Sequence, residues 1–265
     1  MSEQFGRVAR LVLGSNGSGV DLSGLRIRFV ITKTSASTAN EAKIEVYNVS
    51  PEHSSLFIKA GTDILLMAGY EGNEQMIFTG QVRRGTRRVE GVDRILVIES
   101  GDGDSAIDSA TVNKTLEKGC TNDDIASECQ AAMGVPTGHT DKLDDKPHAR
   151  GKTVSGKASE VMDRVVVRHD AQWSIQDGQL VMLKGDNTRP NAVWLISDDT
   201  GMLGSPEETE DGLKVSTLLN PAYLIGGVAK VESVYINGGI RIEKIEHSGD
   251  THGAEWASKL EGIRV

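Results

Sequence analysis

The chain has 265 residues, of which 38% are hydrophobic and only 4% aromatic, and its 29 basic and 38 acidic side chains leave a formal net charge of -9. This length can bury a core without disulfide bonds, and the acidic balance disfavours a nucleic-acid-binding protein, which needs a basic face. The few aromatic residues argue against a surface that stacks bases or sugars, and 30 glycines with 6 prolines favour a turn-rich β protein.

The two cysteines, Cys120 and Cys129, form no CxxC pair and have no cluster of histidines beside them. Metal binding by thiolates is therefore disfavoured, and we expect two free thiols in a reducing compartment. The N-terminus lacks a signal-peptide core, and no apolar run reaches the roughly 18 residues of a membrane helix. We expect a soluble protein made in a cytoplasm.

The first hundred residues follow a period of two, which predicts half-buried strands. A short helix is expected over 52–59, with Ser50 as its N-cap and Pro51 at its first position. Turns are expected at 14–19, 71–74 and 90–93. The predicted strands are 7–13, 25–31, 42–47, 63–70, 75–84 and 87–100. They predict an antiparallel sheet curled toward a barrel, in a first domain over 1–104.

The middle of the chain has helical signals. Residues 121–133 begin at an N-cap candidate, Thr121, and stop at Gly134, and a second helix is expected over 156–166. A tight hairpin is expected around Asp177-Gly178, and the polar stretch 138–152 is expected to be a loop. These elements predict a small α+β unit over 105–190.

Strands return in the last third, with turns expected at 237–239 and 249–253. The predicted strands are 193–197, 212–219, 227–234, 239–248 and 254–265. They predict a second barrel-like domain over 191–265. The fold class is therefore mainly β (α+β), with two antiparallel β-barrel-like domains flanking the α+β unit. No close sequence repeat is visible, yet this arrangement is itself roughly symmetric.

The best candidate for a metal or catalytic site is the run that contains His247, Asp250 and His252. Two imidazoles and a carboxylate within six residues could converge on zinc. The same residues are also typical of a turn between strands, because Gly-Asp-Thr forms an Asx-type turn. The turn is the favoured interpretation, and no metal or cofactor is expected.

Other candidate sites have simpler interpretations. The glycine-rich run 14–19 has no Lys-Ser or Lys-Thr and is interpreted as a hairpin turn. Asp102, Asp104 and Asp108 do not have the spacing of an EF-hand and are expected in an interdomain loop. His169-Asp170 lacks a serine in a strained elbow. The acidic run 207–211 is expected to be an exposed loop.

The one basic concentration consists of Arg83, Arg84, Arg87 and Arg88, across a Gly85-Thr86 link. A phosphate site, a solvated hairpin and a contact with acidic residues of a neighbouring subunit are all compatible with it. Because the chain carries a net charge of -9, a neighbouring subunit offers acidic partners, and the interface hypothesis is that these four arginines contact them.

Several segments of the last third resemble the second tube domain of phage baseplate hub proteins of contractile tails, which are related to tail-tube proteins and type VI secretion spike hubs. These segments are 198–206, 209–215, 218–221, 241–251 and 255–256. Segments of the first third are similar to the first hub domain, and segments of the middle resemble the family's middle part. They are 25–31, 40–50, 69–70, 77–80, 156–163 and 173–178. The stretch 138–152 matches nothing in the family.

The resemblance implies a structural protein without enzymatic activity, located in the virion tail and made in the host bacterial cytoplasm. It implies a homotrimeric ring around the tail channel, in which two tube-type domains per subunit match a hexameric tail tube. The implied partners are further copies of the chain, the tail tube or a tube initiator, the central spike and the C-terminus of the tape-measure protein. DNA would pass the channel without specific binding, and no membrane binding is implied. Because no lysozyme or spike follows within the sequence, the spike is expected to be a separate protein.

Two other functions stay open at this stage. One is a tail-tip protein of a non-contractile tail. The other, from a different class, is a small zinc-dependent hydrolase using His247, Asp250 and His252.

Overall fold

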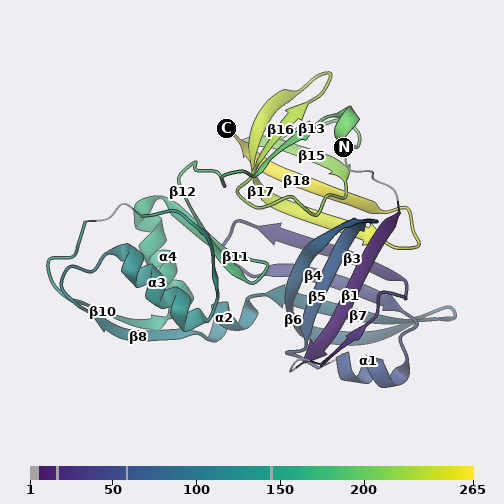
Figure 1. The fold of residues 1–265 in the computed structure, drawn as a ribbon, viewed down its shortest axis with the longest axis horizontal. Helices are drawn as coiled ribbons and strands as arrows, with labels where there is room; N and C mark the ends of the chain where they lie inside the picture. Colours follow the sequence, from purple (N-terminus) through teal and green to yellow (C-terminus); the bar gives the residue numbers. More distant parts are fainter. Residues whose placement is uncertain (1–5, 16–17, 58, 144–145) are drawn as a thin grey trace.

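The computed structural model describes residues 6–15, 18–57, 59–143 and 146–265. Strands dominate, and most neighbouring strands pair in antiparallel fashion (Figure 1). The expected mainly β (α+β) class is confirmed. Among the described residues, no helix combines the length and the apolar character needed to cross a bilayer.

The first part of the chain forms strands around one short helix, as the period-two pattern predicted. Ser50 caps this helix as expected, because its Oγ accepts the backbone N–H of His53 at 3.2 Å. The elements are β1 (Arg7–Ser15), β2 (Ser18–Asp21), β3 (Ile27–Thr34), β4 (Asn40–Tyr47), α1 (Pro51–Phe57), β5 (Asp63–Tyr70), β6 (Asn73–Glu90) and β7 (Asp93–Asp102). Residue 58 of the expected helix and residues 16–17 of the expected 14–19 turn lie outside the described residues.

The middle part carries the two main helices. Thr121 and Asp124 form a reciprocal capping box at the start of α3, and Gly134 ends this helix in the left-handed conformation at φ 67°, so both expected ends are confirmed. The elements are α2 (Asp104–Ser109), β8 (Thr111–Leu116), α3 (Asn122–Met133), β9 (Thr137–Thr140), β10 (Lys152–Lys157), α4 (Ala158–Val166), a 3-10 turn (Val167–His169), β11 (Ala171–Gln176) and β12 (Gln179–Lys184).

The last part is again built of strands. Its elements are β13 (Val193–Ile196), a 3-10 turn (Asp198–Thr200), β14 (Glu207–Glu208), β15 (Gly212–Leu218), β16 (Val228–Glu232), β17 (Asn237–Asp250) and β18 (Trp256–Arg264).

One 13-stranded sheet joins the first and last parts of the chain, in the order β14-β15-β18-β17-β3-β4-β7-β6-β5-β1-β2, with β13 and β16 attached beside β17. The junction lies between β17 and β3, which pair from Lys244↔Thr34 to Asp250↔Arg28. The two β-rich parts therefore share one continuous sheet, and the described strands form no separate closed barrels. In Figure 1, the unit built on α3, α4, β8 and β10 lies beside this sheet.

Three buried apolar clusters lie mainly in the three parts, the first also including Leu219 and Trp256 of the last part, and each cluster contains or contacts one tryptophan. Trp256 lies in the first cluster, with its ring 5.6 Å from that of Phe29, and Trp173 lies in the cluster of the middle part. Trp194 packs against the third cluster, beside Tyr223. The domain boundaries at 104/105 and 190/191 stay a prediction.

Three local expectations were wrong. The first is the separation of strands 75–84 and 87–100 by a link at 85–86. β6 instead runs unbroken through Gly85 and Thr86, because these residues pair with Ile98 and Val97 of β7. The expected turn at 237–239 is the start of β17, and the chain reverses just before it, where the Asn237 side chain accepts the N–H of Ser233 at 2.9 Å.

The third concerns the expected loops. The segment containing Asp104 and Asp108 forms the short helix α2, while Asp102 ends β7. The stretch 138–152 contributes its first residues to β9 and its last to β10, and residues 144–145 within it lie outside the described residues.

Candidate assembly surfaces

The three residues of the candidate zinc cluster point to separate environments. His247 is fully buried in β17, with Nδ1 2.8 Å from Oγ of Ser258. His252 is exposed, and its Nδ1 lies 3.0 Å from Oγ1 of Thr251. Burial, followed by the charge of Lys33, lowers the pKa of His247 to about 3, so its ring is neutral.

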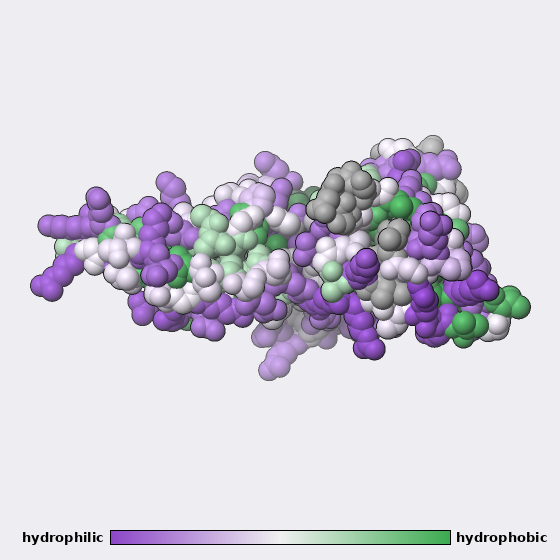
Figure 2. Space-filling model, turned by 90° about the horizontal axis from the view of Figure 1, so that it is seen from below, coloured by the Kyte–Doolittle hydropathy of each residue, from purple (hydrophilic) through white to green (hydrophobic). Residues whose placement is uncertain are grey.

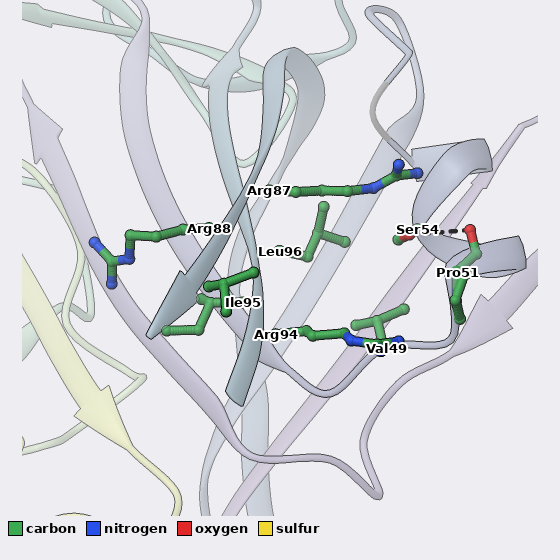
Figure 3. A pocket seen from close by; sticks show the side chains of 9 residues that line it. Val49, Pro51, Ser54, Arg87, Arg88, Arg94, Ile95 and Leu96 are labelled. Carbon is green, nitrogen blue, oxygen red and sulfur yellow. Dashed lines mark hydrogen bonds between the residues drawn. The ribbon is translucent and has the colours of Figure 1, made fainter. Parts of the chain in front are cut away.

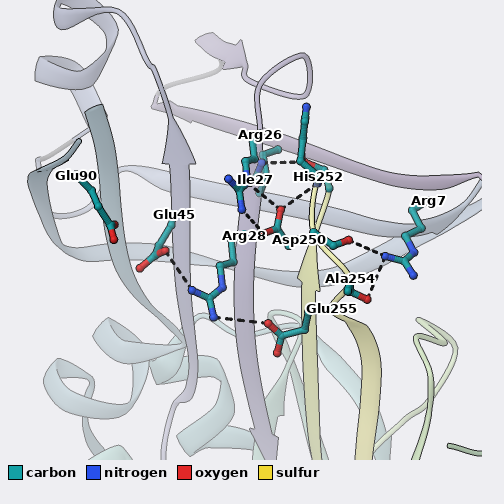
Figure 4. Close-up of polar contacts among 12 residues, drawn as sticks. Arg7, Arg26, Ile27, Arg28, Glu45, Glu90, Asp250, His252, Ala254 and Glu255 are labelled. Carbon is teal, nitrogen blue, oxygen red and sulfur yellow. Dashed lines mark hydrogen bonds and ion pairs between the residues drawn. The ribbon is translucent and has the colours of Figure 1, made fainter. Parts of the chain in front are cut away.

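Asp250 holds the end of β17 in place. Arg26 donates from Nε and Nη2 to the Asp250 carboxylate at 3.0 and 2.6 Å, and the backbone N–H of His252 donates to Oδ1 at 2.9 Å (Figure 4). This is the Asx-type turn favoured from the sequence. The hydrogen bond from Arg26 is the main cause that lowers the pKa of Asp250. In the part of the chain that the structure describes, no three His, Cys, Asp or Glu side chains are placed to hold a metal ion.

The remaining candidates also lie in structural contacts. His169 has Nε2 2.9 Å from the Asn122 amide nitrogen, rather than beside a nucleophile. Both cysteines are free, and burial raises the pKa of the Cys129 thiol to about 11, where it is protonated and unreactive at neutral pH. The acidic run 207–211 is exposed, as expected, but Glu207 and Glu208 form the edge strand β14.

The four arginines of the interface hypothesis all lie in the second half of β6. Arg83 is the extra residue of a bulge and donates to Asp104 at 2.6 Å and to Glu41 at 3.2 Å, and the hydrogen bond to Asp104 is the main cause that raises its pKa. Arg84 is exposed and has no side-chain partner among the described residues.

Arg87 and Arg88 point to opposite faces of β6 near its end. Arg87 lines a notch of about 220 Å³ between the β6–β7 hairpin and α1, and donates to Oγ of Ser55 at 2.7 Å (Figure 3). Arg88 lies 3.5 Å from Glu45 and 3.3 Å from Glu90. The Arg87–Ser55 and Arg88–Glu90 contacts lie at the surface and contribute little to stability, whereas the Glu45 side chain is only 8% exposed.

The hairpin that carries these arginines ends in an apolar tip. Val89 and Val92 are 73% and 95% exposed. In Figure 2, apolar atoms gather at the end of the molecule where this hairpin projects, on an otherwise largely hydrophilic face. Exposed apolar side chains beside charged ones are common at protein–protein contacts.

The strand registers show that the first and last parts of the chain follow one plan. β6 and β17 each carry a one-residue bulge, at Arg83 and Glu243, within their hairpin pairing with the next strand, β7 or β18. Immediately after each bulge, a basic residue lies opposite a glutamate, Arg84↔Glu99 in β6–β7 and Lys244↔Glu261 in β17–β18.

The match continues on the far side of each glutamate. Glu99 is flanked by Lys43 of β4, and Glu261 is flanked by Lys214 of β15. Residues opposite one another on paired strands share a face, so each part carries the same basic–acidic–basic row on one face of the sheet. The two β-rich parts therefore share this bulge and this charged row, although no sequence repeat reveals them.

This face, opposite the apolar clusters, is polar along the continuous sheet. We call it the open face, defined by Arg28, Lys43, Arg84, Glu99, Lys214, Lys244, Glu246, Lys259 and Glu261. Six of these residues are basic and three are acidic. Acidic side chains lie between the basic ones, and ion pairs such as Lys259–Glu246 at 3.2 Å and Arg28–Glu45 at 3.9 Å offset part of the positive charge.

A buried polar cluster joins the middle part to the sheet. Lys33 donates to both carboxylate oxygens of Asp177 at 2.6 and 2.7 Å, and Asn40 donates to the carbonyl of Ile175 at 2.8 Å. Asp102 accepts the backbone N–H of Gly178 at 3.1 Å, and burial, followed by the charge of Asp177, raises its pKa to about 7. Because the buried groups are hydrogen-bonded, the cluster fixes the β11–β12 turn on β3, β4 and β7.

Sequence reasoning missed this cluster, although one signal pointed to it. Lys33 lies in the inward phase of β3, after Ile27, Phe29 and Ile31. A lysine at a core position requires a buried acidic partner. The strand predicted from the sequence ended at residue 31, so Lys33 was not recognised as an inward-facing residue of β3.

The architecture is that of phage tail proteins. A prophage MuSo2 43 kDa tail protein from Shewanella oneidensis has a TM-score of 0.69 at 12% identity, over 97% of this chain and 98% of that one. The tail protein from Neisseria meningitidis MC58 has a TM-score of 0.67 at 10% identity, over 98% and 97%. The E. coli c3393 protein, a component of the type VI secretion system, has a TM-score of 0.67 at 10% identity, over 96% and 76%.

Within this class, the family is established by sequence. The profile of the family Baseplate hub gp41 matches residues 9–262, so the chain belongs to that family. No curated protein matches the chain.

Proposed function

We propose that this chain is a structural hub subunit of a phage tail baseplate, without enzymatic activity. Three copies form a ring that joins the tail tube to the central spike, with 1–104 and 191–265 as its tube halves and 105–190 as a flanking unit. The protein acts in the virion tail after synthesis in the host cytoplasm.

The observation that carries the proposal is the repeated plan of the two β-rich parts. Both have the bulged strand, the same hairpin and the same basic–acidic–basic row. A duplicated half is what a threefold ring needs in order to face a sixfold tube, because three subunits then present six similar surfaces.

The open face suits the wall of a channel. A glutamate separates the two basic residues of each row, and Lys259 and Arg28 are paired with Glu246 and Glu45, so a polyanion meets no continuous basic strip and DNA can pass without sticking. The tape-measure protein C-terminus is a further transient occupant of the same channel.

The proposal is tested by the mass of the chain in solution, alone and with the spike and tube proteins of the same particle. We expect three chains per complex when the spike protein is present, each of 28.4 kDa. A chain that stays monomeric with both partners would contradict the proposal. A hydrolase would instead require stoichiometric zinc and an activity lost in His247→Ala.

A further inference from the structure

The second half of β6 is a sheet edge without a neighbour. β5 pairs with β6 only as far as Asp63↔Gln81, and from Arg83 to Glu90 the sole partner of β6 among the described strands is β7. An unpaired edge exposes backbone N–H and C=O groups that can bind another strand. This edge also carries Arg84, Arg87 and Arg88.

The strand β14, at one end of the same sheet, is acidic. β14 pairs on one side only, with β15, and consists of Glu207 and Glu208. The exposed residues Glu210 and Asp211 follow it. Arg264 holds Glu208, whereas Glu207 has no ion pair with any described residue. The charges of the two edges are therefore opposite.

The repeated plan shows how the two edges fit. β17 corresponds to β6, because both have the bulge, and the pairs Lys244↔Glu261 and Arg84↔Glu99 correspond. Counting along the strands from these pairs, His247 corresponds to Arg87 and Ser248 to Arg88. β17 has a neighbour on its second side, β3, where Ser248 lies opposite Val30 and His247 opposite Ile31. β6 lacks such a neighbour among the described strands of its own chain.

The missing strand can be identified by the same counting. β3 lies beside β4 with Val30↔Lys43, and β14 lies beside β15 with Glu207↔Lys214. Lys43 and Lys214 correspond, since each flanks the glutamate of its row. The counterpart of Val30 is therefore Glu207, and the counterpart of Ile31 is Glu208.

We propose that β6 of one copy pairs antiparallel with β14 of a second copy of this chain, with Arg88 opposite Glu207 and Arg87 opposite Glu208. The inference rests on the proposed ring and assigns its subunit contact. Strand correspondence alone defines this register, and the register places two arginines opposite two glutamates. It also brings Arg84 toward Asp211. The intermolecular contact thus copies the β17–β3 junction inside each chain and continues the sheet from copy to copy.

Facing side chains agree with this register. Arg88 projects from the open face, because it lies four residues after Arg84 in β6, and Glu207 does so because it lies opposite Lys214. Their neighbours Arg87 and Glu208 therefore both project from the opposite face. A shift by one residue would place each arginine on the wrong side of the sheet from its glutamate.

Charge reversal tests the pairing in the full chain, with the spike protein of the same particle added. Arg87→Glu with Arg88→Glu, and separately Glu207→Arg with Glu208→Arg, should each weaken trimer formation at least about tenfold, because like charges then face each other. The fourfold variant that carries both reversals should restore it. A matched control swaps an exposed pair away from the edges, Lys230→Glu with Glu232→Lys, and should assemble as the wild type does.

Disulfide trapping tests the register and does not depend on how the charge variants fold. In a Cys120→Ser background, Arg88→Cys with Glu207→Cys should form interchain disulfides on oxidation, while Arg88→Cys with Lys230→Cys should not. Trimers that persist in both reversed variants, or absence of the Arg88–Glu207 cross-link in an assembled trimer, would overturn the pairing and leave the ring intact. A wild-type chain that never trimerises would overturn the pairing together with the ring.

Discussion

The cluster that fixes the middle part on the sheet makes a quantitative prediction about Asp102. This side chain is 2% exposed, and its carboxylate accepts the N–H of Gly178 at 3.1 and 3.3 Å. Burial and the neighbouring charge of Asp177 together raise its pKa from 3.8 to about 7, against the opposing effect of Lys33. The ionised form is therefore less stable in the folded protein than in the unfolded chain.

The change to make is Asp102→Asn, which keeps the shape and an oxygen that can accept the Gly178 N–H. At 1.36 kcal/mol per pKa unit, the shift corresponds to about 4 kcal/mol of stability lost by the wild type above pH 7. The folded protein holds this proton to a higher pH than the unfolded chain does, so the loss grows as pH rises from 3.8 to 7. Because the neutral amide of the variant would give up the attraction of Lys33, we expect a gain of about 2–4 kcal/mol at pH 8 and almost none at pH 4.

The assay is urea unfolding at several pH values, followed by tryptophan fluorescence, to which Trp173 in the apolar cluster of the middle part contributes. Glu117→Gln, at an exposed position, is the control and should change stability little at any pH. A variant that is less stable than the wild type at pH 8, or whose difference from it does not depend on pH, would refute this reasoning.

Three further predictions follow from single contacts. Lys33→Met should cost about 3–5 kcal/mol in the same urea assay, because it leaves Asp177 without its buried partner; a loss below about 1 kcal/mol would contradict this. Thr121→Ala should lower stability by about 1 kcal/mol through loss of the capping box, and an unchanged unfolding midpoint would count against it. His247 should stay neutral at pH 5 by NMR of its ring, since its pKa is lowered to about 3. Its contribution to stability is lost as pH falls below 6.5, where the unfolded chain takes up a proton, and a ring that titrates near pH 6.5 would disprove its burial.

Elements defined by local interactions could be predicted from the sequence. The helix α3 starts at a capping box and ends at a left-handed glycine, and both signals lie within the segment. The β11–β12 hairpin turns at Asp177 and Gly178, which have φ 53° and 74°, values that Asp and Gly tolerate.

Features that depend on distant parts of the chain could not be predicted. The β17–β3 junction pairs residues more than two hundred positions apart, and nothing local specifies it. β14 is two residues long, and the bulges at Arg83 and Glu243 become visible only once the strands are paired. The repeat stayed hidden because its matched residues are few and lie on different strands, and other corresponding positions differ in character, as Val30 and Glu207 do.

The residues of the candidate zinc site do not converge on one point, and strand geometry explains why. His247 and Asp250 are three residues apart in one strand, so their side chains project from opposite faces. The expected strand ended at residue 248, which left Asp250 in the turn and hid this constraint.

The central claim is that three chains form a ring whose wall is the open face. An electron microscopy reconstruction of the chain bound to its spike protein tests it most directly. We predict a threefold ring with six similar halves, in which Lys43, Glu99, Lys214 and Glu261 line the channel. A ring of another symmetry, or one in which these residues face the outside, would contradict the account.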